Sequence, residues 1–255
     1  MKTTKGKFMQ TLREQRSAQT IRRKPESTRR GLFIVIEGID SSGKGVQSNL
    51  LSKRLKKLGK KVLSQDFPRY YSSAFGKMVG EFLVGKYGKF DTTDPHLVVL
   101  LYMLDQYTWA RDIGKPWLEK GGAVVLDRYF TSNVHQVAKF KTIKKKKYRE
   151  WLWPLGYKEL GIIKPDLVLF LNVSPDITKK LIKTKKDRGY LNGRKKDNAE
   201  KNWKHQWASY KEYLHMTKSQ KSWVAIKCMQ DKSLDTPQVI HERIWKEVAK
   251  LFNGI

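Results

Sequence analysis

Apolar residues occur along this chain in two alternating patterns, short continuous runs and longer stretches with helical spacing. The runs predict buried strands at residues 32–36, 61–63, 123–126, 166–172 and 223–228. The helical spacing predicts a helix from Lys44 to just before Gly59, and further helices over about 74–84, 95–119 and 237–252. Strands that are apolar throughout and separated by helices indicate a parallel sheet covered on both faces. The sequence therefore predicts one α/β domain over residues 31–255.

A glycine-rich turn, residues 38–45 with the sequence Gly-Ile-Asp-Ser-Ser-Gly-Lys-Gly, follows the first predicted strand. Glycines let a backbone curl until several N–H groups point inward, and the helix that follows adds the positive end of its dipole. The Lys44 ammonium can bridge β- and γ-phosphates. We interpret this turn as a phosphate-binding loop for ATP rather than a structural glycine turn. The residues expected to contact the nucleotide are Gly38, Asp40, Ser41, Ser42, Gly43, Lys44, Gly45 and Val46.

The position after Lys44 departs from the usual phosphate loop. Gly45 and Val46 stand where a serine or threonine would offer a hydroxyl to Mg²⁺. We therefore expect the ion to depend on water, nucleotide oxygens and the carboxylates of Asp40 and Asp127.

The triplet Asp127-Arg128-Tyr129 directly follows the predicted strand 123–126. The carboxyl ends of parallel strands form the ligand-binding edge of a sheet, so this triplet is expected beside the phosphate loop. Asp127 can hold Mg²⁺ or its water shell, and Arg128 can neutralise the transferring phosphoryl group. An ion pair at the strand end, with no catalytic role, is the alternative explanation.

Together these motifs resemble the thymidylate kinase family over about residues 31–252. The loop, Phe67-Pro68-Arg69-Tyr70, Asp127-Arg128-Tyr129 and Lys164-Pro165-Asp166 occur in the order and spacing of that family. The resemblance implies a P-loop three-layer fold with a five-stranded parallel sheet, a mobile lid and usually a homodimer. It also implies transfer of the γ-phosphoryl group of MgATP to dTMP, with no covalent intermediate.

The resemblance assigns roles to single residues. Asp40 is similar to the acid that contacts the sugar 3′-hydroxyl, and Arg69 to the arginine that grips the acceptor phosphate. Tyr102 falls where an aromatic ring stacks on thymine, although an aromatic on an apolar helix is more often core. Gln106 replaces an arginine that commonly faces the thymine carbonyl. Further residues that the resemblance implies for the substrate pocket are Phe67, Arg128, Ser132, Asn133 and Gln136.

The lid implied by the resemblance covers about residues 183–196. One branch of the family carries a catalytic arginine in the phosphate loop and another carries it in the lid. Ser41 stands at the loop position, so this chain resembles the second branch, with Arg188 and Arg194 as the candidate catalytic arginines. A closing lid would exclude water and deliver positive charge as the transition state forms.

Net charge changes the picture of possible partners. The chain has 255 residues and a formal charge of +29, concentrated in residues 1–30, 141–150 and 179–204. Basic surfaces bind polyanions, so nonspecific nucleic-acid contact is considered beside a merely solvated lysine-rich surface. Residues 1–30 lack an apolar period and are predicted to form a mobile basic tail, with an organellar transit peptide as the alternative.

Composition excludes several other classes. The one cysteine, Cys228, rules out an intramolecular disulfide, and no apolar run approaches the ~20 residues of a membrane span. The histidines lack metal-ligand spacing. We predict a cytoplasmic protein without membrane contact. Two alternative functions stay open: a kinase of another nucleotide or of a deoxynucleoside, and a kinase-derived basic protein that binds nucleic acid or a ribonucleoprotein. Arg69 opposes a nucleoside acceptor, which has no phosphate to grip.

Overall fold

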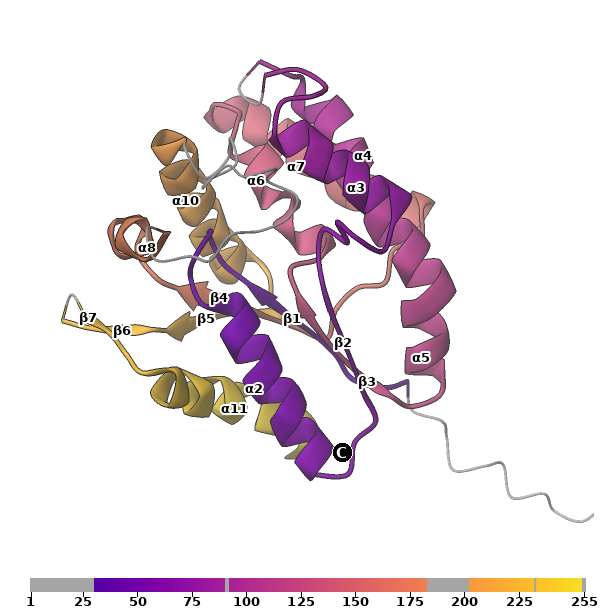
Figure 1. Ribbon diagram of the computed structural model, residues 1–255, viewed down its shortest axis with the longest axis vertical. Helices are drawn as coiled ribbons and strands as arrows, with labels where there is room; N and C mark the ends of the chain where they lie inside the picture. The colour runs from indigo at the N-terminus through magenta and orange to yellow at the C-terminus, as the bar shows by residue number, and fades with distance from the viewer. Residues whose placement is uncertain (1–29, 90–91, 183–201, 232, 254–255) are drawn as a thin grey trace, which may run out of the picture.

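A computed structural model describes residues 30–89, 92–182, 202–231 and 233–253 (Figure 1). The predicted basic tail, apart from Arg30, lies outside the described residues. So do the predicted lid at 183–196 and its candidate arginines, Arg188 and Arg194.

A parallel sheet of five strands in the order β2-β3-β1-β4-β5 forms the centre of the molecule, which confirms the predicted fold class. The strands are β1 (Phe33–Glu37), β2 (Val62–Asp66), β3 (Ala123–Asp127), β4 (Leu167–Asn172) and β5 (Trp223–Lys227). The chain leaves β1 toward β2 on one side, and β4 returns to the other side of β1. This reversal beside β1 is where open α/β sheets bind ligands.

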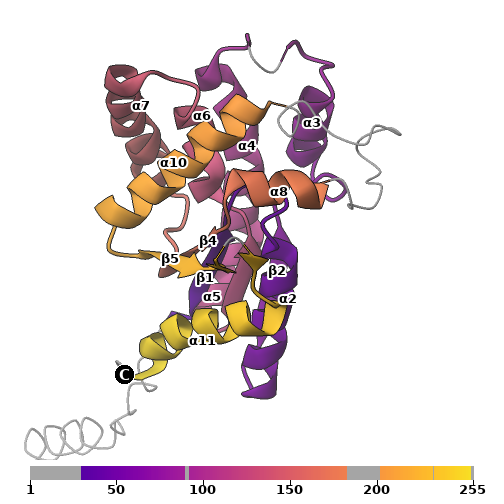
Figure 2. The same cartoon turned by 90° about the vertical axis from the view of Figure 1, so that its left-hand side faces the viewer.

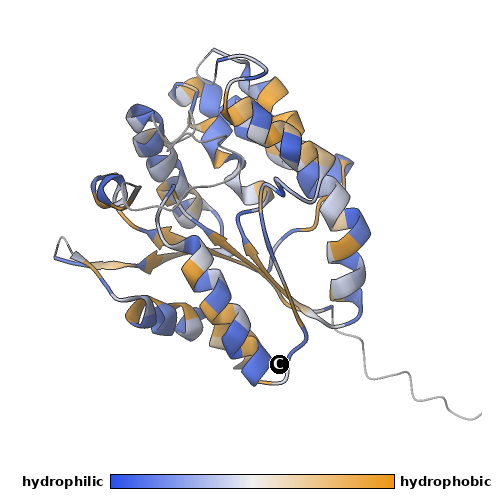
Figure 3. Ribbon diagram, viewed as in Figure 1, coloured by the Kyte–Doolittle hydropathy of each residue, from blue (hydrophilic) through white to orange (hydrophobic). Residues whose placement is uncertain are grey.

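Successive residues of β1 serve two separate cores, because side chains alternate across a strand. Phe33 and Val35 pack into the first core, whereas Ile34 and Ile36 pack into the second. All four side chains are fully buried, so the strand reads as a continuous apolar run (Figure 3). Because both faces of β1 are buried at these four positions, each of them is apolar, and this produces the continuous apolar run in the sequence.

Helices cover both faces of the sheet (Figures 1 and 2). The second core lies under α2 (Lys44–Lys57) and α11 (Pro237–Asn253), where Leu51 and Leu55 of α2 are fully buried. Burying such a leucine contributes about 1.5–3 kcal/mol. The other α-helices that the structure describes are α3 (Ala74–Leu83), α4 (Pro95–Trp109), α5 (Lys115–Glu119), α6 (Val134–Val137), α7 (Thr142–Pro154), α8 (Pro175–Ile182) and α10 (Trp203–Ser219).

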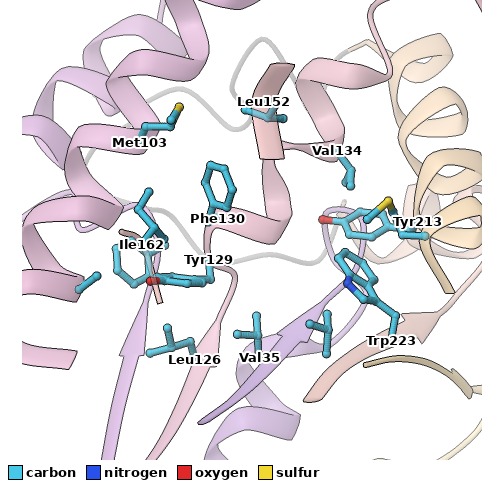
Figure 4. Close-up of a cluster of buried hydrophobic side chains, with 14 of the residues drawn as sticks. Val35, Met103, Leu126, Tyr129, Phe130, Val134, Leu152, Ile162, Tyr213 and Trp223 are labelled. Atoms are coloured by element: carbon cyan, nitrogen blue, oxygen red, sulfur yellow. The ribbon is translucent and has the colours of Figure 1, made fainter. Parts of the chain in front are cut away.

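The first core is rich in aromatic rings (Figure 4). Tyr129 packs edge-on against Phe33 and Trp109, with centroids 5.1 and 5.7 Å apart. Tyr213 of α10 stacks on Phe170 at 4.9 Å. These contacts fix the segment after β3 and the helix α10 on the same face of the sheet, next to the ligand-binding edge.

The structure refines the predicted elements in two places. The single helix expected over 95–119 is α4, a π-helical turn η1 (Ala110–Gly114) and α5. A short antiparallel hairpin, β6 (Met229–Gln230) with β7 (Ser233–Leu234), follows β5 and was not predicted. Within the described ranges, no helix is both long and apolar enough to cross a membrane.

Candidate functional site

The glycine-rich turn lies at the carboxyl end of β1 and leads directly into α2 (Figure 1). Gly43 precedes the helix with a φ of 90°, and Ser41 has a φ of 64°, which side-chain-bearing residues adopt at a cost. Gly43 has no side chain to cap α2, so the N-cap residue leaves the first N–H groups of the helix available to a ligand. Lys44 is buried there, with its Nζ donating to the Ile39 carbonyl at 3.0 Å.

Two buried hydroxyls suit this turn to an anion with many oxygens. Ser41 Oγ and Ser42 Oγ are buried without a hydrogen-bond partner among the described residues. An unpartnered buried polar atom costs free energy unless a ligand supplies the partner. Beside them, a Cβ built on Gly43 meets no atom within 4 Å. The turn therefore combines open space, a helix N-terminus, a buried ammonium and hydroxyl donors, which fits a phosphate chain.

Asp127 borders the phosphate turn on the side of α2. Ile36 of β1 is in register with Asp127 at the end of β3, and this pairing brings the carboxylate to the turn. A Cβ built on Gly45 would lie 3.4 Å from Asp127 Oδ2. The position that lacks a hydroxyl is thus immediately beside a carboxylate oxygen, and oxygen is the ligand that Mg²⁺ prefers.

Arg128 links the phosphate turn to the opposite wall of the site. Its backbone has a φ of 68°, and its Nη2 donates to Asp40 Oδ1 at 2.6 Å. The other oxygen of Asp40, Oδ2, accepts from Gln206 Nε2 of α10 at 2.7 Å. Both oxygens of Asp40 accept a hydrogen bond, so this carboxylate ties the phosphate turn to Arg128 and to α10.

A second carboxylate, Glu37, lies beneath Arg128 and is fully buried at the end of β1. It accepts hydrogen bonds from the hydroxyls of Thr131 and Ser132 and from Tyr213 at 2.6–2.9 Å. Burial raises the pKa of Glu37 above its ordinary value, while the positive charge of Arg128 and these hydrogen bonds oppose the rise. The network joins β1, the segment after β3 and α10 under the site.

His135 of α6 is the next group around Arg128. The distance from Arg128 Nη1 to His135 Nε2 is 3.2 Å, and Ser132 Oγ and Tyr213 OH lie 3.4 Å from the same nitrogen. The sequence pattern gave this histidine no role. The structure shows that it belongs to the site, because the fold brings α6 against the end of β3.

Arg69, predicted to grip the acceptor phosphate, is buried against Asp105 of α4. Its Nε donates to Asp105 Oδ1 at 2.9 Å, and its Nη2 donates to the Asp105 carbonyl and to Thr108 Oγ1. A Cβ on Gly76 would lie 2.3 Å from the Arg69 carbonyl, so only glycine lets α3 approach this closely. Asp105 and α3 together fix the position of Arg69, and its role toward a phosphate stays a prediction.

The residues predicted for the base and sugar pocket occupy different environments. Gln106 and Asn133 are buried and bonded to each other, with Asn133 Nδ2 donating to Gln106 Oε1 at 3.3 Å. Tyr102 is half-buried and packs on the cluster of Val79, Phe82, Leu83 and Val98. Phe67 is a core residue, edge-on to Trp109 and Tyr129. Gln136 is buried, and its Oε1 has no partner in the described part of the chain.

The sequence profile of the thymidylate kinase family matches residues 36–238. The chain belongs to the thymidylate kinase family. The match begins in β1, includes the phosphate turn, Arg69, Asp127 and α10, and ends at the start of α11. The resemblance seen in the sequence is therefore confirmed.

Individual thymidylate kinases match over part of their length. A probable thymidylate kinase of Thermococcus gammatolerans is 33% identical over 148 residues, 56% of this chain and 66% of the relative. The thymidylate kinase of Sulfurihydrogenibium sp. is 32% identical over 167 residues, 62% and 74% of the two chains. That of Danio rerio is 30% identical over 151 residues, 59% and 65%. The matches thus span about two thirds of the length of several relatives.

A solved structure of a thymidylate kinase from Candida albicans has the same fold. It superimposes with a TM-score of 0.63 at 22% identity and covers 88% of this chain and 93% of its own. At this identity the likeness concerns the arrangement of strands and helices. It agrees with the five-stranded parallel sheet described above.

Among the residues of this site, Glu37, Asp105, Gln206 and His135 were not assigned a role from the sequence. Glu37 and Asp105 carried a signal, because each is an acid within an otherwise apolar strand or helix, where burial is costly without a partner. Gln206 and His135 carried no such signal. Both lie in polar, basic or mixed segments, and only the packing of α10 and α6 brings them to Asp40 and Arg128.

Proposed function

We propose that this protein transfers the γ-phosphoryl group of MgATP to dTMP, giving dTDP and ADP. The observation that supports it best is the meeting of the phosphate turn, Asp127 and the Asp40–Arg128 pair at one sheet edge, in a chain of the thymidylate kinase family. The reaction needs positioning and charge neutralisation rather than a covalent intermediate. The site offers groups for both tasks.

On the donor side, the N–H groups at the start of α2 and the hydroxyls of Ser41 and Ser42 bind phosphate oxygens. Lys44 leaves the Ile39 carbonyl for the β- and γ-phosphates, since a charged partner binds an ammonium more strongly than a peptide oxygen. Gly38 lets the turn close tightly, because a Cβ there would lie 2.5 Å from Ser42 Oγ. Val46, half-exposed at the start of α2, faces the remainder of the nucleotide.

On the metal side, Asp127 and Asp40 would hold Mg²⁺, directly or through water, and Asp40 also contacts Arg128 and Gln206. When bound, the ion offsets the negative charge of the phosphate oxygens.

On the acceptor side, Arg128 and Arg69 bind the phosphate of dTMP, and Asp40 accepts from the sugar 3′-hydroxyl. Tyr102 contacts the thymine ring, and the Gln106–Asn133 pair and Gln136 offer amide groups to its edge. Ser132 keeps its hydroxyl on Glu37 and supports Arg128 from below. The resemblance also implies a lid at 183–196 with Arg188 and Arg194, which lies outside the described residues.

A homodimer is part of the proposal. Leu97, Leu100 and Leu104 of α4 are exposed and share one face of the helix, at the spacing that places residues on one side. An apolar stripe of this kind suits burial against a second copy of the same helix.

The predicted cytoplasmic location would be tested by cell fractionation.

Nonspecific nucleic-acid contact is the second partner proposed. The helix α7 exposes Lys144, Lys146 and Lys147 on its surface, beside Lys141 at its start. Such a cluster attracts phosphates through counterion release, with an affinity that falls steeply as salt rises. This nucleic-acid contact is proposed in addition to the kinase activity and does not depend on that activity.

An assay of ADP release against a panel of acceptors tests the function. We expect turnover with dTMP, weaker turnover with dUMP, and little with dCMP, dGMP or thymidine, which lacks the acceptor phosphate. Lys44→Ala should lower kcat by about 100-fold or more through lost phosphate stabilisation. Lys53→Ala, an exposed lysine on the same helix, is the matched control. Failure with every acceptor, alongside salt-sensitive RNA binding, would reject the kinase assignment.

A further inference from the structure

His135 occupies a defined place beside the cation of the acceptor site. Its Nε2 lies 3.2 Å from Arg128 Nη1, which is closer than the other two groups around that nitrogen, the hydroxyls of Ser132 and Tyr213. From α10, the ring of Tyr213 meets it edge-on at 5.5 Å and the ring of His205 lies 5.7 Å away. The imidazole is thus fixed between α10 and Arg128.

The protonation state of this imidazole follows from its partner. A guanidinium only donates hydrogen bonds, so a nitrogen that receives one must carry a lone pair. Nε2 of His135 is therefore unprotonated, and the proton of the neutral ring is on Nδ1. Burial, with the charge of Arg128 in support, lowers the pKa of His135 well below its ordinary value, which agrees with a neutral ring.

A neutral acceptor gives Arg128 an orientation without taking its charge. The carboxylate of Asp40 fixes Nη2 and partly offsets the positive charge. A third carboxylate in place of His135, next to Asp40 and Glu37, would make the surroundings of Arg128 repel a phosphate. The imidazole instead holds Nη1 while the guanidinium stays attractive to an anion.

We propose that His135 is a positioning residue that holds the Arg128 guanidinium, through the hydrogen bond from Nη1 to Nε2, in the orientation that receives the acceptor phosphate. The inference rests on the proposed function, since it assigns Arg128 to the phosphate of dTMP. It concerns binding of the acceptor and leaves the donor side, with Lys44 and the phosphate turn, unchanged.

Steady-state kinetics of three variants test the proposal. His135→Phe keeps the ring volume and removes the acceptor, and we expect its KM for dTMP to rise about 10- to 100-fold, as for loss of a hydrogen bond to a charged group. Its KM for ATP should change less than about twofold, because the donor side is intact. His135→Gln, which can present an amide oxygen to Nη1, should recover most of the loss. His215→Phe, at an exposed histidine of α10, is the matched control.

A measurement without turnover separates this inference from the proposed function. Long-range ¹H–¹⁵N NMR correlations of the wild-type imidazole should show His135 protonated on Nδ1 and bare on Nε2 near neutral pH. A protonated Nε2, an unchanged KM for dTMP in His135→Phe, or equal damage in His135→Gln would overturn the positioning role. Absence of dTMP turnover in the wild-type protein, with the expected tautomer present, would instead overturn the proposed function.

Discussion

Charged side chains at the site are buried or partly buried, and each is held by particular oxygen atoms. Arg128 lies between Asp40 and the hydroxyls that Glu37 organises, and Lys44 lies on the Ile39 carbonyl. In a low-dielectric site such contacts are stronger than in water, and removing one partner leaves a costly charge. Single substitutions here should therefore have measurable consequences for stability as well as for activity.

Glu37 gives a prediction for the pH dependence of stability. Its folded-state pKa is raised above the ordinary value of 4.5, so the folded protein binds this proton more readily than the unfolded chain. Binding of this proton stabilises the folded protein. The stabilisation is absent above the folded-state pKa, appears as the pH falls through that pKa, and is complete below 4.5. Glu37→Gln cannot bind the proton. As the pH falls, the unfolding free energy of the wild type should therefore rise relative to that of the variant. The rise should be about 1.4 kcal/mol for each pH unit by which the folded-state pKa of Glu37 exceeds its ordinary value.

Urea denaturation of both proteins at about pH 7 and about pH 5 measures this difference. Glu150→Gln, an exposed glutamate on α7, serves as the control and should show no such shift. A wild-type advantage that shrinks on acidification would contradict the raised pKa.

At the scale of elements, α4 carries an acid that organises a neighbouring loop. The side chain of Asp105 is 1% exposed. Its carboxylate accepts hydrogen bonds from the Nε and the backbone N–H of Arg69, both at 2.9 Å. The helix thereby fixes the segment after β2 at the edge of the site. A buried ion pair of this kind contributes little over an apolar pair but is costly to break.

Asp105→Asn should therefore destabilise the protein by about 3–5 kcal/mol, because it leaves the buried Arg69 charge without its carboxylate. Asp112→Asn breaks the exposed pair with Arg111, where 52% of the Asp112 side chain is accessible, and should cost less than about 1 kcal/mol. Urea denaturation of the two variants gives the comparison. Equally small effects of the two substitutions would contradict this prediction, because they would mean that water or another group compensates the charge of Arg69.

At the scale of the whole molecule, two surface features bear on the proposed association. The net charge of +29 repels like copies at long range and attracts polyanions. The apolar stripe on α4, the proposed dimer contact, would instead act at short range. With Leu97 64% and Leu100 41% exposed, the stripe is accessible in the single chain.

Leu100→Glu places a charge in the middle of this stripe and should weaken a dimer by about 2 kcal/mol or more, because a central interface position is desolvated on association. Sedimentation velocity over a range of concentrations and at moderate salt measures the change. Val239→Glu, at an exposed apolar position on α11, is the control and should leave the dimer intact. A wild-type protein that sediments as a monomer throughout would remove the dimer from the proposal.

The sequence by itself determined the sheet, the phosphate turn and the edge at which the site lies. These follow from local rules, because buried parallel strands must be apolar throughout and a phosphate turn needs glycines between a strand and a helix. Lys44, Asp127 and Arg128 were found for that reason. The family profile confirms the resemblance that the same motifs carried.

Only the tertiary structure decided which groups surround each charge. Gln206 meets Asp40 across 166 positions of the chain, and Tyr213 meets Glu37 across 176, so no local pattern relates them. Arg69 was assigned to a phosphate from its motif, whereas packing of α4 against its loop supplies Asp105 as an internal partner. Periodicity records which residues are buried. The partners of a buried charge depend on how α4, α6 and α10 pack, and that is set by the whole fold.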